Sequence, residues 1–347
     1  MPRIQVLNRQ ATFDCPFPTT ILDAALDAGI DYPFGCQSGS CGACKTRLIS
    51  GEVELADHTE LALNAKEREA GLILACRATP KTDCTVVFLE DSEAHRHPVR
   101  TLAGQVVATE RLTHDILLVR IGFKGGEAPL AFSAGQFASL SFPGAPARDY
   151  SMANTPGGET LEFHIRHIPN GVVSTLVHRA DIVGQPVTVK GPYGVSYLRH
   201  EHAAPFLAAA GGSGLAPIAS IVETALQLGM RQRIMLYFGA RTERDLYYVE
   251  RFEHLARTFP NLQYVPVLSM TDASETRLRT GFLADAIRAD HSDLRGWKTY
   301  IAGPPPMVDT VTEAVRALGV APGDCHTDPF FTTADRANPS DKAQGSA

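Results

Sequence analysis

Four cysteines have the spacing that an iron-sulfur cluster requires. Cys36, Cys41 and Cys44 lie in one short segment, and Cys76 follows after a long gap. Three thiolates from one loop can enclose one side of a small cluster, and a fourth from a distant segment closes the other side. This is the spacing of plant-type 2Fe-2S clusters. The pattern therefore predicts a one-electron centre.

The glycines between these cysteines support the same interpretation. Glycine can adopt positive φ angles and allows the close approaches of a loop whose N–H groups point at sulfur atoms. The glycines concerned are Gly35, Gly39 and Gly42.

Two other uses of the cysteines fit the sequence less well. A disulfide framework is disfavoured by the odd total of seven cysteines and by the lack of an apolar leader at the start of the sequence. A structural zinc site would need paired knuckles, and only Cys41 and Cys44 form a Cys-x2-Cys pair. The remaining cysteines are scattered and are expected to be small buried apolar residues: Cys15, Cys84 and Cys325.

A second group of residues could bind a flavin. A flavin needs a cation for its phosphate, an aromatic surface for its ring and a hydrogen-bonding group at N5, and Arg148, Tyr150 and Ser151 offer these close together. Taken alone, these residues fit a solvated arginine beside a core tyrosine better. The segment 170–174, Asn-Gly-Val-Val-Ser, precedes an apolar helical run, and a helix N-terminus there could hold a pyrophosphate.

A third group of residues could bind a dinucleotide. The turn Gly211-Gly-Ser-Gly-Leu-Ala-Pro217 follows a buried strand and opens a helix, where glycines let the backbone approach phosphates and the helix dipole favours their charge. Pro217 stands where a third glycine is usual, and a tight structural turn is the alternative interpretation. The segment 302–307, Ala-Gly-Pro-Pro-Pro-Met, has the same setting and is expected to line the same crevice.

Three kinds of segment must position these groups. Residues 1–92 read as a small mixed α/β unit, with a hairpin over 5–13, a helix over 20–29 and a strand that delivers Cys76. Thr20 is a suitable N-cap for that helix, and Gly29 ends it. Residues 93–99 read as a linker.

The rest of the chain changes pattern twice. Residues 100–202 contain short β-rich runs separated by Gly/Pro turns, which predict an antiparallel β-barrel. Residues 203–333 alternate strands with helices, including a helix from about Glu243, which predicts a doubly wound parallel sheet with its crevice at the carboxyl ends of the strands. The polar tail 334–347 is expected to be disordered.

Composition and charge narrow the function. The chain has 347 residues, 44% of them hydrophobic and 20% charged, as expected for a globular protein of two or three domains. The sequence has no apolar stretch long enough to predict a membrane span, and we expect a cytoplasmic location. Nucleic acid is not expected as a partner, because no basic stripe is present.

The net charge is unevenly distributed. Residues 1–95 hold 8 Lys and Arg against 14 Asp and Glu, which accounts for the whole net charge of −6. An acidic surface around a one-electron centre could dock a more basic protein, or it could simply be solvated.

With these motifs combined, the chain resembles the NAD(P)H-dependent ferredoxin reductase components of bacterial multicomponent oxygenases. Within that group it is most similar to those serving naphthalene-type ring-hydroxylating dioxygenases and salicylate hydroxylases. The resemblance covers residues 3–331 and includes the three motifs in the family's order. It implies a β-grasp 2Fe-2S ferredoxin domain, a six-stranded antiparallel barrel for FAD, an NAD(P)-binding domain and a monomeric protein.

The resemblance also implies roles for individual residues. Arg148 would bind the FAD phosphate, Tyr150 would stack on the isoalloxazine and Ser151 would face N5, while Asp328 and Phe330 correspond to an acidic and an aromatic residue near the flavin. Further FAD contacts would come from His164, Ile165, Arg166, Gly171, Val172, Val173 and Ser174. Nicotinamide-dinucleotide contacts would come from Gly211, Gly212, Ser213, Gly214, Pro217, Arg241, Ala302, Gly303 and Pro304.

Two sequence features bear on the rate of hydride transfer and on the choice between NADH and NADPH. Many relatives carry a cysteine where this chain has Ala302, so the rate of hydride transfer is expected to differ. After the second strand of the last domain, Glu243 would favour the free ribose of NADH, whereas Arg241 and Arg244 could accept the 2′-phosphate of NADPH. We expect NADH, with NADPH as the alternative.

The three sites together predict an electron path. A nicotinamide gives up two electrons as a hydride and the cluster accepts one, so FAD must stand between them. The expected acceptor is a Rieske-type ferredoxin or an oxygenase component. The alternatives are a reductase for a di-iron monooxygenase or a sugar-deoxygenating enzyme, and a passive iron-sulfur carrier or redox sensor.

Overall fold

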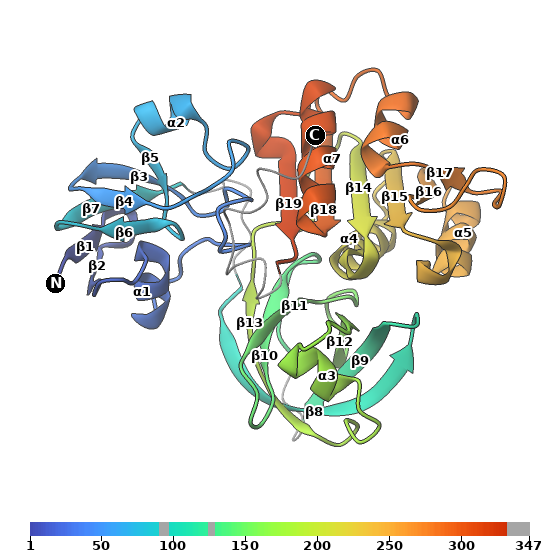
Figure 1. The fold of residues 1–347 in the computed structure, drawn as a ribbon, viewed down its shortest axis with the longest axis horizontal. Helices are drawn as coiled ribbons and strands as arrows, with labels where there is room; N and C mark the ends of the chain where they lie inside the picture. Colours follow the sequence, from blue (N-terminus) through green and yellow to red (C-terminus); the bar gives the residue numbers. More distant parts are fainter. Residues whose placement is uncertain (90–96, 124–128, 332–347) are drawn as a thin grey trace. The chain divides into compact units, whose positions relative to one another are not determined.

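The computed structural model describes residues 1–89, 97–123 and 129–331, and its ribbon is drawn in Figure 1. The chain divides into two compact units: residues 1–94 with 329–347, and residues 95–328. Part of the predicted linker and the whole predicted tail, 334–347, lie outside the described residues. In the described ranges, no helix has both the length and the apolar character needed to cross a bilayer.

The first unit is built on a mixed five-stranded sheet in the order β2-β1-β7-β3-β5, beside a two-stranded ribbon of β4 and β6. β1 pairs antiparallel with β2 and parallel with β7, as the predicted β-grasp fold requires. Its elements are β1 (Arg3–Val6), η1 (Leu7–Arg9), β2 (Ala11–Asp14), α1 (Ile21–Asp27), β3 (Lys45–Ser50), β4 (Val53–Leu55), α2 (Ala65–Glu69), β5 (Leu72–Leu74), β6 (Ala78–Pro80) and β7 (Cys84–Phe88).

The helix α1 forms where the sequence predicts it. The Thr20 side chain accepts a hydrogen bond from the N–H of Asp23, and Gly29, with φ of 74°, follows its end. Helix α2 is not predicted by the apolar pattern, because its residues are polar. A capping box between Asn64 and Glu67 stabilises its first turn instead.

The second unit contains the predicted antiparallel barrel, with six strands in the order β11-β10-β13-β8-β9-β12. A bridge between Met152 and Phe163 links the two ends of this sheet and nearly closes it. The elements are β8 (Arg100–Arg111), β9 (Ile116–Phe123), β10 (Phe137–Ser141), β11 (Arg148–Ser151), β12 (Thr160–Arg166), α3 (Val172–Val177) and β13 (Pro186–Tyr193).

Strand β12 has two differently used faces. Leu161, Phe163 and Ile165 are buried in the hydrophobic core of the barrel. Successive side chains of a strand point to opposite faces, so His164 and Arg166 lie on the other face. β12 therefore closes the barrel and also presents polar groups outside it.

The second sheet of this unit has the order β17-β16-β15-β14-β18-β19, and β14 pairs in parallel with both β15 and β18. It is the predicted doubly wound sheet. The elements are β14 (Phe206–Gly211), η2 (Gly212–Gly214), α4 (Leu215–Gln227), β15 (Ile234–Ala240), η3 (Glu243–Asp245), α5 (Val249–Thr258), β16 (Leu262–Leu268), β17 (Arg279–Thr280), α6 (Leu283–Asp290), β18 (Lys298–Gly303), α7 (Pro305–Ala317), η4 (Pro322–Asp324) and β19 (Cys325–Pro329).

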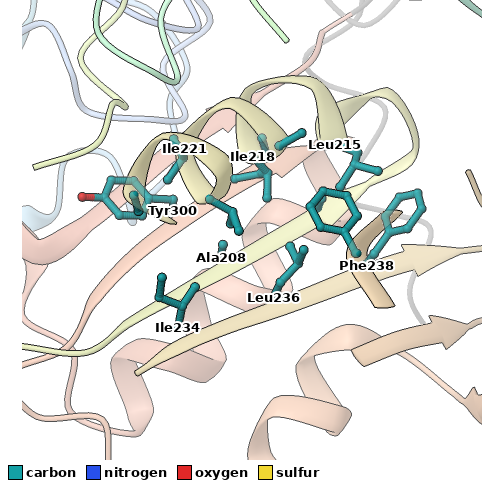
Figure 2. Packing of buried hydrophobic residues seen from close by; sticks show 14 of the residues in the cluster. Ala208, Leu215, Ile218, Ile221, Ile234, Leu236, Phe238 and Tyr300 are labelled. Atoms are coloured by element: carbon teal, nitrogen blue, oxygen red, sulfur yellow. The ribbon is translucent and has the colours of Figure 1, made fainter. Parts of the chain in front are cut away.

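Helices cover both faces of this sheet. On one face, apolar residues of α4 pack on β14, β15 and β18, as Figure 2 shows for Leu215, Ile218 and Ile221 above Ala208 and Leu236. On the other face, α6 and α7 pack on the same strands in a second cluster. The nucleotide turn at the start of α4 is thereby held on a rigid layer.

The predicted helix from Glu243 is wrong in its first part. Only a single 3-10 turn, η3, forms there, closed by a capping box between Thr242 and Asp245. Tyr248 adopts a left-handed conformation with φ of 59°, and α5 begins at Val249. The turn between η3 and α5 places the tyrosines of this segment against the barrel, as described below.

Candidate functional site

The cluster loop directs backbone N–H groups at sulfur atoms. Cys36 Sγ accepts hydrogen bonds from the N–H groups of Ser38 (3.5 Å) and Ser40 (3.4 Å). Cys41 Sγ accepts one from the N–H of Cys36 at 3.4 Å. Such bonds stabilise thiolates, which is what cluster ligands must be.

The four predicted ligands form two thiol pairs. Cys41 donates a hydrogen bond to Cys36, and this bond, with those from the backbone, lowers the pKa of Cys36 to about 5. Cys76 donates to Cys44, and this bond and burial raise the pKa of Cys76 well above its ordinary value. Each iron of a binuclear cluster takes two protein sulfurs, so two adjacent pairs fit a 2Fe-2S cluster.

Single-ion sites have a different geometry. Among residues 1–89, 97–123 and 129–331, no three His, Cys, Asp or Glu side chains converge as they would around one metal ion. The cluster ligands are instead grouped two by two. Cys15 and Cys84 are buried, as predicted, while Cys325 is only partly buried.

The glycines of the loop have two different roles. Gly39 and Gly42 have φ angles of 77° and 72°, as predicted. Gly35 has no positive φ and provides the predicted close approach instead. A Cβ at Gly35 would lie 3.2 Å from Cys41 Sγ, so this glycine leaves space for the sulfur.

Strand β11 carries the predicted flavin triad. The half-buried Arg148 donates a hydrogen bond to the carbonyl of Ala147 at 2.8 Å, and in the described part of the chain it has no carboxylate partner. The partly buried Tyr150 ring packs against the apolar core of the barrel, and burial raises the pKa of Tyr150 to about 12. A free guanidinium and a shielded aromatic ring fit a flavin phosphate and ring.

Ser151 and Asp328 are brought together although they are 177 residues apart. Ser151 is buried, and its hydroxyl donates a hydrogen bond to Asp328 Oδ2 at 3.0 Å. This contact joins β11 of the barrel to β19 of the parallel sheet. The second compact unit ends at Asp328, and Phe330 belongs to the first unit. The role of Phe330 beside the flavin therefore stays a prediction.

The side chains of the next predicted flavin segment have other partners. Ile165 is buried in the barrel core. Arg166 Nε donates to Asp115 Oδ2 at 2.7 Å, and the bonds from Arg166 and Thr113 lower the pKa of Asp115 despite its partial burial. His164 Nδ1 lies 3.0 Å from the hydroxyl of Tyr247. At His164 and Ile165 any flavin contact would therefore come from the backbone, whereas the Arg166 guanidinium is bonded to Asp115 through Nε and has its Nη1 near Gly212.

The segment at α3 is compact. Gly171 is the N-cap of this helix, and a Cβ there would lie 2.5 Å from Ser174 Oγ. Ser174 is buried, and its hydroxyl accepts a hydrogen bond from the N–H of Ile168 at 3.1 Å. Val172 is 59% exposed, whereas Val173 is buried in the barrel core. Backbone groups at Gly171 and Val172 are therefore the accessible ones.

The nucleotide turn lies where three strands end together. Gly211 is in register with Gly239, and Ala210 is in register with Ala302. A Cβ at Gly214 would overlap the carbonyl oxygen of Ala302, and one at Gly303 would lie 2.8 Å from the Gly211 oxygen. The structure thus brings the Gly211 turn and the Ala302 segment together, as predicted.

The rest of the turn is consistent with close backbone approach. Gly212 has φ of 55°, a conformation that glycine adopts without strain. Pro217 lies in the first turn of α4, where its missing N–H costs no hydrogen bond.

The end of β15 holds an ion pair that the sequence pattern did not single out. Arg241 Nη2 donates to Asp245 Oδ1 at 3.2 Å. Asp245 Oδ2 accepts from the N–H and the hydroxyl of Thr242, and these bonds and Arg241 lower the pKa of Asp245. Glu243 instead accepts a bond from Thr276.

Two further residues were not predicted. Tyr247 contacts His164 and Gly212, which are 83 and 35 residues away in sequence, and Asp115 holds Arg166. No local motif marks either residue: Tyr247 bonds across the boundary between the barrel and the parallel sheet, and Asp115 lies in a loop of the barrel, 51 residues before Arg166.

Family models match three segments of the chain. Residues 4–81 match the 2Fe-2S iron-sulfur cluster binding domain, residues 103–197 the oxidoreductase FAD-binding domain and residues 209–313 the oxidoreductase NAD-binding domain. These matches confirm the predicted fold class and the cofactors 2Fe-2S, FAD and NAD(P)H.

Curated relatives are similar over nearly the whole chain. The reductase component of naphthalene 1,2-dioxygenase/salicylate 5-hydroxylase systems from Ralstonia sp is 40% identical, over 90% of this chain and 94% of its own. The reductase component of the naphthalene 1,2-dioxygenase system from Pseudomonas putida is 36% identical, over 94% and 98%. The reductase subunit of an aromatic O-demethylase from Amycolatopsis is also 36% identical, over 91% and 95%.

Solved structures agree. The Amycolatopsis cytochrome P450 reductase GcoB is 34% identical with a TM-score of 0.75, over 96% of this chain and 99% of its own. The ferredoxin reductase of carbazole 1,9a-dioxygenase is 28% identical with a TM-score of 0.70, over 95% and 98%. Together with the cluster loop, the flavin strand and the nucleotide turn, these similarities show that the chain belongs to the ferredoxin–NAD(P)+ reductase components of oxygenase systems, enzymes that join a 2Fe-2S domain to FAD- and NAD-binding domains.

Proposed function

We propose that this protein transfers electrons from NADH, through FAD and the 2Fe-2S cluster, to a Rieske-type ferredoxin or an oxygenase component of an aromatic-ring-hydroxylating system. The observation that carries this proposal is the 40% identity with the reductase component of naphthalene 1,2-dioxygenase/salicylate 5-hydroxylase systems. When bound, FAD supplies the conversion of a two-electron donor into single electrons.

The residues of the chain hold and orient these groups. Arg148 offers its guanidinium to the FAD phosphate, and Tyr150 offers its ring to the isoalloxazine. The Ser151 hydroxyl donates a hydrogen bond to Asp328 at 3.0 Å. Its oxygen can therefore accept a hydrogen bond from an N–H group of the flavin. The remaining FAD contacts are the predicted ones at residues 164–166 and 171–174.

The nicotinamide site uses the crowded turn. We place the pyrophosphate at Gly211, Gly212, Ser213, Gly214 and Pro217, and the nicotinamide beside Ala302, Gly303 and Pro304. Ala302 is buried and its carbonyl abuts Gly214, so the backbone of this segment is constrained although the cysteine of many relatives is absent. We also propose that Phe330 shields the flavin.

We propose NADH as the preferred donor. Arg241, the cation nearest the end of β15, is engaged by Asp245, whose carboxylate is fixed by Thr242. A neutralised guanidinium attracts a 2′-phosphate weakly. The Asp245→Asn variant should keep the cap but lose the ion pair, and its kcat/KM ratio for NADPH over NADH should rise about threefold. An unchanged ratio would contradict this assignment.

The electron path is tested by replacing one cluster ligand. Cys41→Ser should leave NADH-dependent reduction of a small dye within about twofold of wild type, because the flavin is intact, and should lower cytochrome c reduction by about 100-fold or more. The matched control is Cys15→Ser, a buried cysteine that is not a ligand. Cytochrome c reduction at the wild-type rate in the Cys41 variant would show that the order of carriers is wrong. Bleaching of flavin absorbance by NADH excludes a passive carrier.

A monooxygenase is the second candidate acceptor. The reductase component of phenol 2-monooxygenase from Pseudomonas is 36% identical, over 93% of both chains, which is close to the figure for the dioxygenase relatives. Reconstitution with a Rieske ferredoxin and terminal dioxygenase, or with a di-iron hydroxylase, decides between them. Product formation with the di-iron hydroxylase alone would reject the dioxygenase assignment.

The proposal also covers the electron acceptor, the cellular compartment and the oligomeric state of the protein. The net charge of −6 over residues 1–95 favours an acceptor with a basic docking face, whose association would slow as salt is raised. None of the seven cysteines, all of which lie in described residues, forms a disulfide, as expected in a reducing cytoplasm. We propose that the protein acts there as a monomer.

A further inference from the structure

The hydroxyl of Tyr247 connects two elements that belong to different cofactor sites. It donates a hydrogen bond to the carbonyl oxygen of Gly212 in the nucleotide turn at 3.2 Å. It also lies 3.0 Å from Nδ1 of His164 on strand β12. Tyr247 is 5% exposed, and its ring is held edge-on by Phe238 and Tyr248.

The direction of these hydrogen bonds follows from the number of protons. Tyr247 has one hydroxyl proton, which it uses toward the Gly212 carbonyl, so Nδ1 of the neutral His164 ring donates to the Tyr247 oxygen. Burial keeps both groups in these forms, since it raises the pKa of Tyr247 and lowers that of His164 to about 3. A chain of donors therefore runs from β12 to the nucleotide turn.

The contact at Gly212 fixes the orientation of a whole peptide. The Gly212 oxygen also accepts a hydrogen bond from the N–H of Leu215, so both of its lone pairs are used. In a planar trans peptide the C=O and the following N–H point in opposite directions. Holding the Gly212 carbonyl toward Tyr247 therefore points the N–H of Ser213 away from it.

This N–H is one that the turn itself does not use. The first N–H groups of a helix have no acceptor within the helix, and Ser213 is the second residue of η2. The φ of 55° at Gly212 is accessible to glycine alone without strain, and its lack of a Cβ leaves several peptide orientations open. A restraint from outside the turn is therefore needed to select one.

We propose that Tyr247 is a positioning residue of the nicotinamide-dinucleotide site: it fixes the Gly212–Ser213 peptide so that the Ser213 N–H faces the pyrophosphate, and it fastens that peptide to flavin strand β12 through His164. This inference rests on the proposed function, which places the pyrophosphate at the turn. It adds a direct link between the two binding sites, through a residue whose hydroxyl is engaged by Gly212 and His164.

Nε2 of His164 supports a role beyond packing. It is buried and has no hydrogen-bond partner in the structure. An unpaired polar atom in the interior costs free energy, and an apolar residue at this position would avoid that cost. The bond that this histidine does make is the one from Nδ1 to Tyr247.

The test compares two adjacent tyrosines. Tyr247→Phe keeps the ring and removes the hydroxyl. Tyr248→Phe is the matched control, because the Tyr248 ring also contacts His164 edge-on, while in the described part of the chain its hydroxyl makes no hydrogen bond. The probe is ADP-ribose, which has the pyrophosphate but no nicotinamide, titrated by calorimetry into the FAD-loaded protein.

For Tyr247→Phe we expect the Kd for ADP-ribose and the KM for NADH to rise about 3- to 10-fold. The kcat for dye reduction should stay within about twofold and the FAD content should not change, because the hydroxyl is proposed to act on binding and not on the transfer step. Tyr248→Phe should match wild type in all four measurements.

Three other outcomes would each contradict a specific part of the argument. An unchanged Kd in Tyr247→Phe overturns the proposal, and so does an equal rise in Tyr248→Phe, which would point to ring packing. Failure of the wild-type protein to bind ADP-ribose would instead reject the proposed nucleotide site itself.

A second variant keeps the test decisive if Tyr247→Phe does not fold. His164→Leu removes the donor to the Tyr247 oxygen but leaves the bond to Gly212, so the Kd for ADP-ribose should rise about two- to threefold. A Kd equal to wild type in that variant would overturn the fastening of the turn to β12.

Discussion

The cluster loop and the nucleotide turn solve the same problem, the presentation of backbone N–H groups to an electron-rich ligand, in different ways. The cluster loop achieves it locally: Ser38 and Ser40 donate to Cys36 within four residues. The nucleotide turn depends on restraints from far away in sequence, at Ala302 and Tyr247. A local site is specified by its spacing, whereas a distributed site is specified by the fold.

The largest expected effect is loss of the flavin without loss of the iron-sulfur cluster. Tyr150→Ala removes the partly buried ring from the flavin strand, and FAD occupancy should fall about 10-fold, because aromatic rings contribute strongly to such contacts. NADH-dependent dye reduction should fall with it, while the visible absorbance of the 2Fe-2S cluster stays. Tyr150→Phe is the control and should retain FAD. Loss of the cluster in Tyr150→Ala would contradict the independence of the two sites.

The next effect tests the crowded backbone of the nucleotide turn. A Cβ at Gly214 overlaps the carbonyl of Ala302, whereas a Cβ at Gly323 meets no atom within 4 Å. Gly214→Ala should therefore lower the free energy of unfolding by about 3 kcal/mol, as overpacking does. Gly323→Ala should change it by less than about 0.5 kcal/mol. Urea unfolding measures both, and equal values would show that the turn relaxes freely.

A third prediction concerns pH. The pKa of His164 is about 3 in the folded protein and 6.5 when exposed, so the unfolded state binds the proton more readily. Its contribution to stability is complete above pH 6.5 and is lost as the pH falls toward 3, which amounts to about 2 kcal/mol at pH 5. His164→Leu should show a smaller loss between about pH 7.5 and pH 5 in urea unfolding. Identical pH dependence in both proteins would refute the shift.

The smallest effect sharpens the local side of the comparison. Gly39 and Gly29 both have positive φ, but a Cβ at Gly39 would lie 3.0 Å from side-chain atoms of Arg77 and His58, and one at Gly29 would meet nothing within 4 Å. Gly29→Ala should cost about 1 kcal/mol from strain alone, and Gly39→Ala about 1 kcal/mol more. Iron content and urea unfolding test this. Equal costs would mean that the loop accommodates a side chain.

The same difference explains what could be predicted from the sequence. The cysteines, the order of the three sheets and the Gly211 turn follow from short-range patterns, and the structure and the family matches agree with them. The contact of Tyr247 with His164 joins residues whose proximity depends on the packing of a barrel against a parallel sheet. No periodicity records such a contact, and the break at Tyr248 that allows it was predicted as helix.

The two faces of strand β12 have a consequence for how such proteins can be recombined. Its odd-numbered residues complete the barrel core, and His164 fastens the nucleotide turn through Tyr247. A chimera that joins this barrel to the nicotinamide domain of another reductase would replace Tyr247 and its surroundings, and so would lose the contact with His164 even if its junction lay in a loop. The unit that can be exchanged without loss is therefore larger than a domain boundary suggests: it includes the outward-facing residues of one strand of the neighbouring domain.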